Sequence, residues 1–190
     1  MLGNSILEND VPEDYNWQFE DVADLNQNSP EQKIIDVDSV NERCFILFSD
    51  LKLIEINLQT KAVVREINVA SLDGASENLS DPSNQKALAF AMFKDLNMIA
   101  VSTPVGLHMF DYETELQFVK TLNLRNVRQI CFVEMYIVLV CDDMNENGPQ
   151  DEAVLLCYMI DSDEPEGQIK IKEFLGHQVK IEPCEQSVCF

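Results

Sequence analysis

Apolar and polar residues form four short strand-like runs between Val127 and Leu175. The runs are VRQICFVE, MYIVLVCDD, AVLLCYMID and QIKIKEFL, and each is rich in β-branched or other apolar residues. Asp, Asn, Gly, Pro or Glu separates one run from the next, as in strands joined by tight connections. This composition is typical of strands and not of helices. The stretch therefore predicts a sheet of four strands.

The same pattern occurs twice earlier in the chain. Residues 33–69 contain IIDVDSV, CFILFS, LKLIEINL and AVVREINV, and residues 87–124 contain ALAFAMF, NMIAVSTP, GLHMFDYE and LQFVKTLN. So many strands in so few residues leave no room for a helix. The segment 70–86 is rich in Ser, Asn, Asp and Pro, which predicts a mobile surface loop. We therefore expect an acidic N-terminal arm at 1–32, repeats at 33–69, 87–124 and 127–175, and the start of a fourth at 177–190.

One position aligns the three repeats. Each third strand ends in an apolar residue that is followed by Asn57, Asp111 or Asp161. The pair Gly176-His177 falls between the third repeat and the fourth. In these features the chain resembles WD-repeat β-propellers, which place an Asp after an aromatic or aliphatic residue at that strand end and a Gly-His pair between blades.

The resemblance implies an all-β fold. The expected architecture is a partial β-propeller of about three four-stranded antiparallel blades plus the start of a fourth. Short strands at this spacing also permit a β-sandwich or a barrel, which remains the alternative.

The number of repeats is small for a propeller. Such folds close with roughly four to eight blades, and open blades leave strand edges free to pair. We therefore expect further blades, supplied by the same chain or by another. Because the sequence stops within the strand-like run QSVCF, we expect it to be the N-terminal part of a larger subunit.

Charge narrows the range of partners. The chain has 34 acidic and 13 basic residues, for a formal net charge of −21. Since nucleic acids and anionic lipids are bound through clustered Lys and Arg, we expect protein partners with basic surfaces and no direct contact with nucleic acid. No apolar run is long enough to span a membrane, and no secretory signal is evident. These observations predict an intracellular protein, cytoplasmic or nuclear, without membrane insertion.

The sequence offers no group of residues for catalysis. It contains no G-x-S-x-G, P-loop or G-x-G-x-x-G motif, so we predict that the protein is not an enzyme. His108 lies in an apolar run and is expected to be a hydrogen-bonded strand residue. Four of the six cysteines lie in such runs, as expected of reduced core thiols.

A polar insert interrupts the third repeat from Asp142 to Glu152. Oxygen-bearing side chains at alternate positions, followed by Gly148, are what a Ca²⁺ loop requires. The insert resembles the short hairpin Ca²⁺ loops of integrin-type propellers. Under that resemblance the metal ligands are Asp143, Asn145, Asn147 and Asp151. An Asn-Gly pair is also a favoured hairpin turn, so a plain turn without a cofactor is the alternative.

Acidic residues gather in the loops of the third repeat. The residues predicted to bind a partner there are Asp142, Glu146, Glu152, Asp163 and Glu164. Complementary charge would speed the encounter with a basic partner, although such residues also serve as plain solvated surface. We therefore expect a non-enzymatic protein-interaction scaffold in a multisubunit assembly. The alternative is a Ca²⁺-binding integrin-type propeller with an adhesion or regulatory role.

Overall fold

The computed structural model describes residues 32–77, 79–145, 148–172, 181–184 and 187–189. For residues 143–145, 148–152, 182–184 and 187–189 only the course of the backbone is described. The predicted arm, apart from Gln32, and the Gly176-His177 pair lie outside the described residues. Within the described part, no helix is long and apolar enough to cross a membrane.

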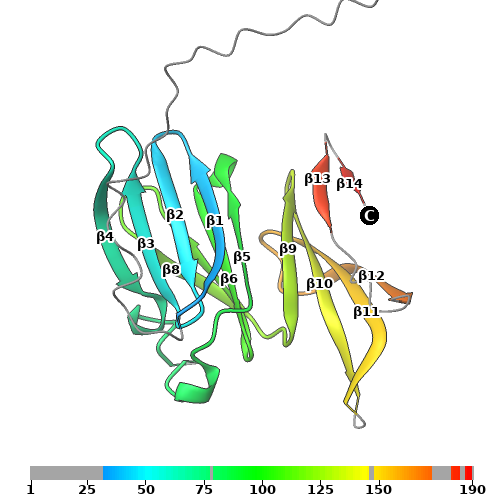
Figure 1. Ribbon diagram of the computed structural model, residues 1–190. Coiled ribbons are helices and arrows are strands. Elements are labelled where there is room, and N and C mark those ends of the chain that lie inside the picture. The colour runs from blue at the N-terminus through cyan, green and yellow to red at the C-terminus, as the bar shows by residue number, and fades with distance from the viewer. Residues whose placement is uncertain (1–31, 78, 146–147, 173–180, 185–186, 190) are drawn as a thin grey trace, which may run out of the picture. The chain divides into compact units, whose positions relative to one another are not determined.

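Three antiparallel sheets of four strands follow one another along the chain (Figure 1). Blade 1 contains β1 (Ile34–Val40), β2 (Arg43–Phe48), β3 (Lys52–Asn57) and β4 (Ala62–Asn68). Blade 2 contains β5 (Ala89–Phe93), β6 (Met98–Thr103), β7 (Gly106–Asp111) and β8 (Gln117–Leu122). Blade 3 contains β9 (Val127–Val133), β10 (Tyr136–Asn145), β11 (Gly148–Met159) and β12 (Pro165–Lys172). The prediction of three four-stranded antiparallel sheets is confirmed.

The remaining elements are short. A hairpin of β13 (Glu182–Cys184) and β14 (Ser187–Cys189) follows blade 3. Single 3₁₀ turns occur at η3 (Val69–Ser71), η4 (Pro82–Asn84) and η5 (Lys94–Leu96). The residues described here contain no α-helix.

The position that aligned the repeats is a turn former. The Oδ1 atom of Asn57 accepts hydrogen bonds from the backbone N–H groups of Gln59, at 3.0 Å, and Thr60, at 2.8 Å. The Oδ1 atom of Asp111 accepts one from the N–H of Glu113 at 2.7 Å. An Asn or Asp side chain bonded to the backbone two residues on reverses the chain, which explains why β3 and β7 end at these residues.

Each blade buries its apolar residues against the next blade. One core joins blades 1 and 2, and its largest members include Phe45, Leu47, Phe90, Ile99 and Phe110. A second core joins blades 2 and 3, and its members include Ala100, Leu107, Met109, Ile137 and Leu139. Blade 2 thus contributes alternate residues to two cores, because successive side chains of a strand point to opposite faces. This explains why its strands are continuous apolar runs.

The segment between blades 1 and 2 is more closely packed than the sequence indicated. Ala75 and Leu79 are buried in the core between those blades. Gly74 has a φ of +88°, and a Cβ atom there would lie 2.4 Å from the ring of Phe118 on β8. The prediction of a loose surface loop at 70–86 is therefore wrong for these residues, since they close the edge of the core.

Strands extend into the polar insert of the third repeat. β10 and β11 continue into it, with Asp142 opposite Ala153 and Asn145 opposite Gly148. The register shifts between Asp142 and Met144, which leaves residues 150–152 as a bulge opposite Asp143. The insert is the far end of a long hairpin.

A buried histidine links three strands of blade 2. The ring of His108 on β7 is fully buried, with Nε2 3.0 Å from the hydroxyl of Thr103 and Nδ1 2.9 Å from the hydroxyl of Thr121. The prediction of a hydrogen-bonded strand histidine is confirmed. Burial lowers the pKa of this imidazole from 6.5 to about 4, because the charged form would lose its hydration.

A buried glutamate ties blade 1 to blade 2. Glu55 on β3 is 4% exposed and accepts hydrogen bonds from the Nε atoms of Arg43, at 2.6 Å, and Arg65. Arg43 donates in turn to the carbonyl oxygen of Tyr112 at 2.9 Å, and Arg65 to that of Thr114 at 3.4 Å. Burial alone would raise the pKa of the Glu55 carboxyl, but the arginines outweigh that effect and the pKa lies below its usual value.

We expect Glu55→Gln to destabilise the protein by about 1–3 kcal/mol at neutral pH. The amide removes the charge that compensates the two arginines, whose side chains are 27% and 23% exposed. Since the pKa of Glu55 is lowered by folding, its contribution is present above the ordinary glutamate pKa and is lost as the pH falls. The gap between wild type and variant should therefore narrow in acid, as measured by urea unfolding. Glu66→Gln, which removes an exposed partner of Lys52, is the matched control and should change little.

We expect His108 to remain neutral well below the pH at which a free histidine is protonated. In a His177→Asn variant it is the sole histidine, so its Hε1 resonance can be followed by NMR without ambiguity. The resonance should stay unchanged from pH 7.5 to about 5.5 and shift near the pKa of about 4. A midpoint near 6.5 would contradict the buried network.

Candidate functional site

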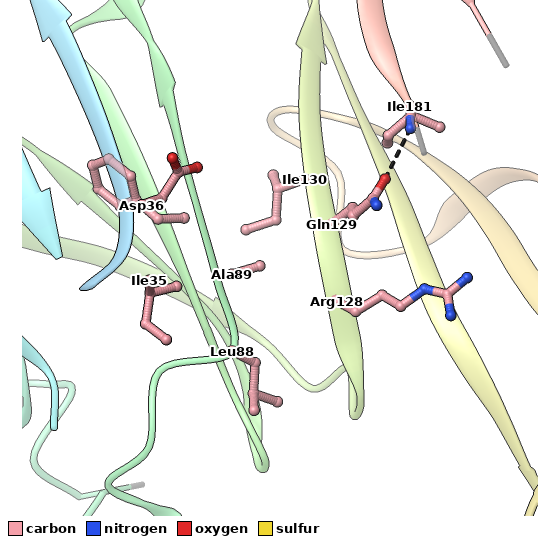
Figure 2. Close-up of a pocket in the computed structure, with 9 residues that line it drawn as sticks. Ile35, Asp36, Leu88, Ala89, Arg128, Gln129, Ile130 and Ile181 are labelled. Carbon is pink, nitrogen blue, oxygen red and sulfur yellow. Dashed lines mark hydrogen bonds between the residues drawn. The ribbon is translucent and has the colours of Figure 1, made fainter. Parts of the chain in front are cut away.

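The first strands of the three blades surround a cavity. β5 contacts both β1 and β9, so these strands lie next to one another although they are far apart in sequence. The cavity has a volume of about 220 Å³. Its lining residues are Ile35, Asp36, Leu88, Ala89, Phe90, Arg128, Gln129, Ile130 and Ile181. We call this the inner-strand pocket (Figure 2).

The walls of the inner-strand pocket are mainly apolar. Ala89 of β5 and Ile130 of β9 point toward one another across it, as Figure 2 shows. Asp36 is exposed beside it. Arg128 points away toward β10 (Figure 2), where its Nη1 atom lies 3.0 Å from Oδ1 of Asp142. The charged residues that line the pocket are Asp36 and Arg128. Arg128 is directed toward β10, whereas Asp36 is exposed to solvent beside the pocket.

Gln129 closes one side of the inner-strand pocket. Its Oε1 atom accepts a hydrogen bond of 2.8 Å from the backbone N–H of Ile181 (Figure 2). Ile181 also packs into the apolar cluster on the face of blade 3 turned away from blade 2, with Cys131 and Val140. Ile181 is thus held against β9 by both a polar and an apolar contact.

A second surface is formed by the turns at the other end of these strands. Within each blade the two turns bond to each other, for example Tyr112 N–H to Asn97 O at 2.8 Å and Ile160 N–H to Met135 O at 2.9 Å. Its acidic residues are Glu42, Asp95, Asp111, Glu113, Glu115, Glu134, Asp161, Asp163 and Glu164. We call this set the acidic end. All except Asp111 are exposed.

Lysines offset part of this charge: Lys61 is exposed in the β3–β4 turn, and Lys94 and Lys120 make ion pairs nearby. Lys94 Nζ lies 2.9 Å from Oδ1 of Asp38 on the neighbouring blade. Lys120 Nζ lies 3.1 Å from Oδ1 of Asp163 and donates to the carbonyl oxygen of Ser162 at 3.0 Å, which links blade 2 to blade 3. The side chain of Asp163 is still 80% exposed, so it remains available to solvent.

The structure separates the residues that were predicted to bind a partner. Asp142 lies on the far part of β10, where it pairs with Arg128 of β9. Asp163 and Glu164 lie in the turn between β11 and β12, at the opposite end of these strands. For Glu152 only the backbone on β11 is described, and Glu146 lies outside the described residues. These residues therefore belong to two surfaces.

The predicted calcium ligands lie in the same hairpin. Asp143 and Asn145 are on β10 and Asp151 is on β11, but their side chains are not described, and Asn147 lies outside the described residues. Elsewhere in the described part no three His, Cys, Asp or Glu side chains are grouped as metal ligands would be. The calcium site remains a prediction.

The thiols with described side chains are free. They are Cys44, Cys131, Cys141 and Cys157. Burial raises the pKa of Cys141 to about 11, and burial also raises the pKa of Cys131. Since the thiolate is the nucleophile, neither is an activated cysteine.

Sequence reasoning missed both the inner-strand pocket and the share of blades 1 and 2 in the acidic end. The pocket residues come from four separate segments of the chain, and the apolar ones resemble ordinary core residues. For the acidic end, a signal was present in Glu113 and Glu115, which follow the aligned Asp111 in the same way that Asp163 follows Asp161.

Comparison with solved structures identifies the fold. No protein-family model matches the sequence, and no curated protein matches it either. A chain in the crystal structure of the mitotic checkpoint complex superposes with a TM-score of 0.53 at 9% identity, over 74% of this chain and 38% of that chain. Sqt1 of Saccharomyces cerevisiae gives a TM-score of 0.54 at 11% identity, over 73% of this chain and 35% of that one.

Both of these proteins are WD-repeat β-propellers. At such low identity the likeness shows the fold, a partial β-propeller with three four-stranded blades. The expected fold is therefore confirmed, in preference to a sandwich or barrel. The matched region amounts to little more than a third of each of these longer chains.

The calcium hypothesis can be tested by isothermal titration calorimetry. If Asp143 and Asp151 are ligands, adding CaCl₂ should produce saturable heat that disappears in the Asp143→Asn/Asp151→Asn double variant, because a hard cation needs charged oxygens. Absence of heat at millimolar Ca²⁺ would leave the plain hairpin turn as the correct interpretation.

Proposed function

We propose that the protein is a non-enzymatic interaction scaffold within a multisubunit intracellular assembly, and that its acidic end receives a basic surface of a partner protein. The observation that carries this proposal is the gathering of exposed acidic residues in the turns of blades 2 and 3 at one end of the strands, to which blade 1 adds Glu42. The propeller fold supports it, because one of the structurally similar chains is part of a multiprotein assembly, the mitotic checkpoint complex.

Rigid support makes these turns suitable for docking. The β7–β8 turn of blade 2 is tied to blade 1 through Tyr112 and Arg43, and the β11–β12 turn of blade 3 is tied to β8 of blade 2 through Ser162 and Lys120. A surface held in place loses little conformational freedom when a partner binds, so more of the interaction energy appears as affinity. A charge of one sign on such a surface would also steer a basic partner toward it.

The outer faces of blades 1 and 3 favour completion by further blades, from the same chain or another. Val64 on β4 is 56% exposed and Ile169 on β12 is 58% exposed. Many apolar strand residues elsewhere in the described chain are buried between one blade and the next, although Val119 on β8 of blade 2 is also 49% exposed. Apolar residues of this size on open blades are what a neighbouring blade would cover.

Charge reversal at the acidic end tests the proposal. We expect a Glu113→Lys/Glu115→Lys/Glu164→Lys variant to lose most of the partners that copurify with the wild type from cells, as quantified by mass spectrometry. Binding of those partners to the wild type should weaken as salt is raised. An Asp73→Lys/Glu77→Lys variant changes exposed acids outside the acidic end and should retain the partners.

Two results would count against the proposal. Recovery of the wild type only as a monomer would argue against a scaffold. Unchanged partner recovery by the triple variant, with unchanged thermal unfolding, would remove the acidic end from the interface.

A further inference from the structure

We propose that the inner-strand pocket binds one aliphatic side chain from an extended segment of a partner protein, with a Lys or Arg next to it in that segment. This inference rests on the proposed function in that it assumes a protein partner. It concerns a different surface, since the pocket residues lie at the starts of β1, β5 and β9, whereas the acidic end begins where these strands finish.

The size of the pocket selects the kind of ligand. Sites for small molecules and cofactors usually measure roughly 300–1,000 Å³. At about 220 Å³ the inner-strand pocket is smaller, and it suits a single side chain of a longer ligand. Anchoring side chains that fill such pockets commonly dominate the affinity of a protein interface.

The lining selects an apolar anchor. Ile35, Leu88, Ala89, Phe90, Ile130 and Ile181 form most of the wall. Of these, Ala89 is 7% exposed, and its short side chain lies opposite Ile130 where a longer residue would fill the space (Figure 2). An aliphatic side chain that enters here loses its contact with water without leaving a polar group of its own unpaired.

The charge at the rim of the pocket favours a Lys or Arg next to the aliphatic residue of the partner segment. Asp36 is exposed on β1, and its Oδ1 atom accepts only the N–H of the adjacent Val37, at 2.8 Å, among the described residues. Arg128, the cation that also lines the pocket, is directed to Asp142 instead. A carboxylate oxygen accepts several hydrogen bonds, so Asp36 can still receive an ammonium or guanidinium group.

Short synthetic peptides test this inference directly. The probe is acetyl-Gly-Gly-Leu-Lys-Gly-Gly-amide, added to the full chain labelled with ¹³C at isoleucine methyl groups. We expect saturable shifts at Ile35, Ile130 and Ile181. Replacing Leu by Ser in the peptide should weaken binding by more than about tenfold, because the buried apolar area is lost. Replacing Lys by Glu should weaken it as well, because Asp36 would face a like charge.

Protein variants complete the test. Ala89→Leu should abolish the shifts by filling the pocket, and Asp36→Asn should raise the dissociation constant roughly two- to fivefold. Asp73→Asn, an exposed acid away from the pocket, is the matched control. If Ala89→Leu unfolds, Ile130→Gln serves in its place, since it places a polar group in the wall.

The outcomes separate this inference from the proposed function. No shift at millimolar peptide, or equal binding of the Leu and Ser peptides, would overturn the inference. If partner recovery still depended on the acidic end, the scaffold function would stand without it. Equal binding of the Lys and Glu peptides would overturn the role of Asp36.

Discussion

The structure depends on burying both faces of each blade. A four-stranded sheet has two faces, and in blade 2 both are apolar, with Phe110 turned to blade 1 and Met109 turned to blade 3. Removing this surface from water supplies the main driving force for folding. Because no such sheet can bury both faces alone, a blade of this kind is stable only between neighbouring blades. This constraint explains why the same four-stranded unit is repeated along the chain.

Polar groups inside this packing are tolerated because they bond to one another. Glu55 is paired with two arginines, and His108 is bonded to two threonines. An unpaired buried charge would be strongly destabilising. The two arginines that pair with Glu55 also donate hydrogen bonds to backbone carbonyl groups of blade 2. These bonds fix the position of blade 1 relative to blade 2.

The sequence was sufficient to predict the strands, but it was not sufficient to predict the inner-strand pocket or the whole of the acidic end. Strand alternation and the turn residues Asn57 and Asp111 are local features, so the sheets could be predicted. The pairing of Arg65 with Glu55 on the neighbouring strand and Thr114 on the next blade depends on three segments meeting. The burial of Ala75 and Leu79 within a polar stretch has the same cause. Local composition described that stretch correctly but could not show what it packs against.

The arrangement of the blades also explains how one small domain presents two chemically different surfaces. Strands that run between the same two ends place every β1–β2 type turn at one end and every first-strand start at the other. The turns are solvated and can carry many acidic residues, whereas the strand starts are shielded by their neighbours and retain Ile35, Ala89 and Ile130. Strand direction therefore puts the acidic end and the inner-strand pocket at opposite ends of the first strands, so a partner that contacts both must extend along the strands from one end to the other.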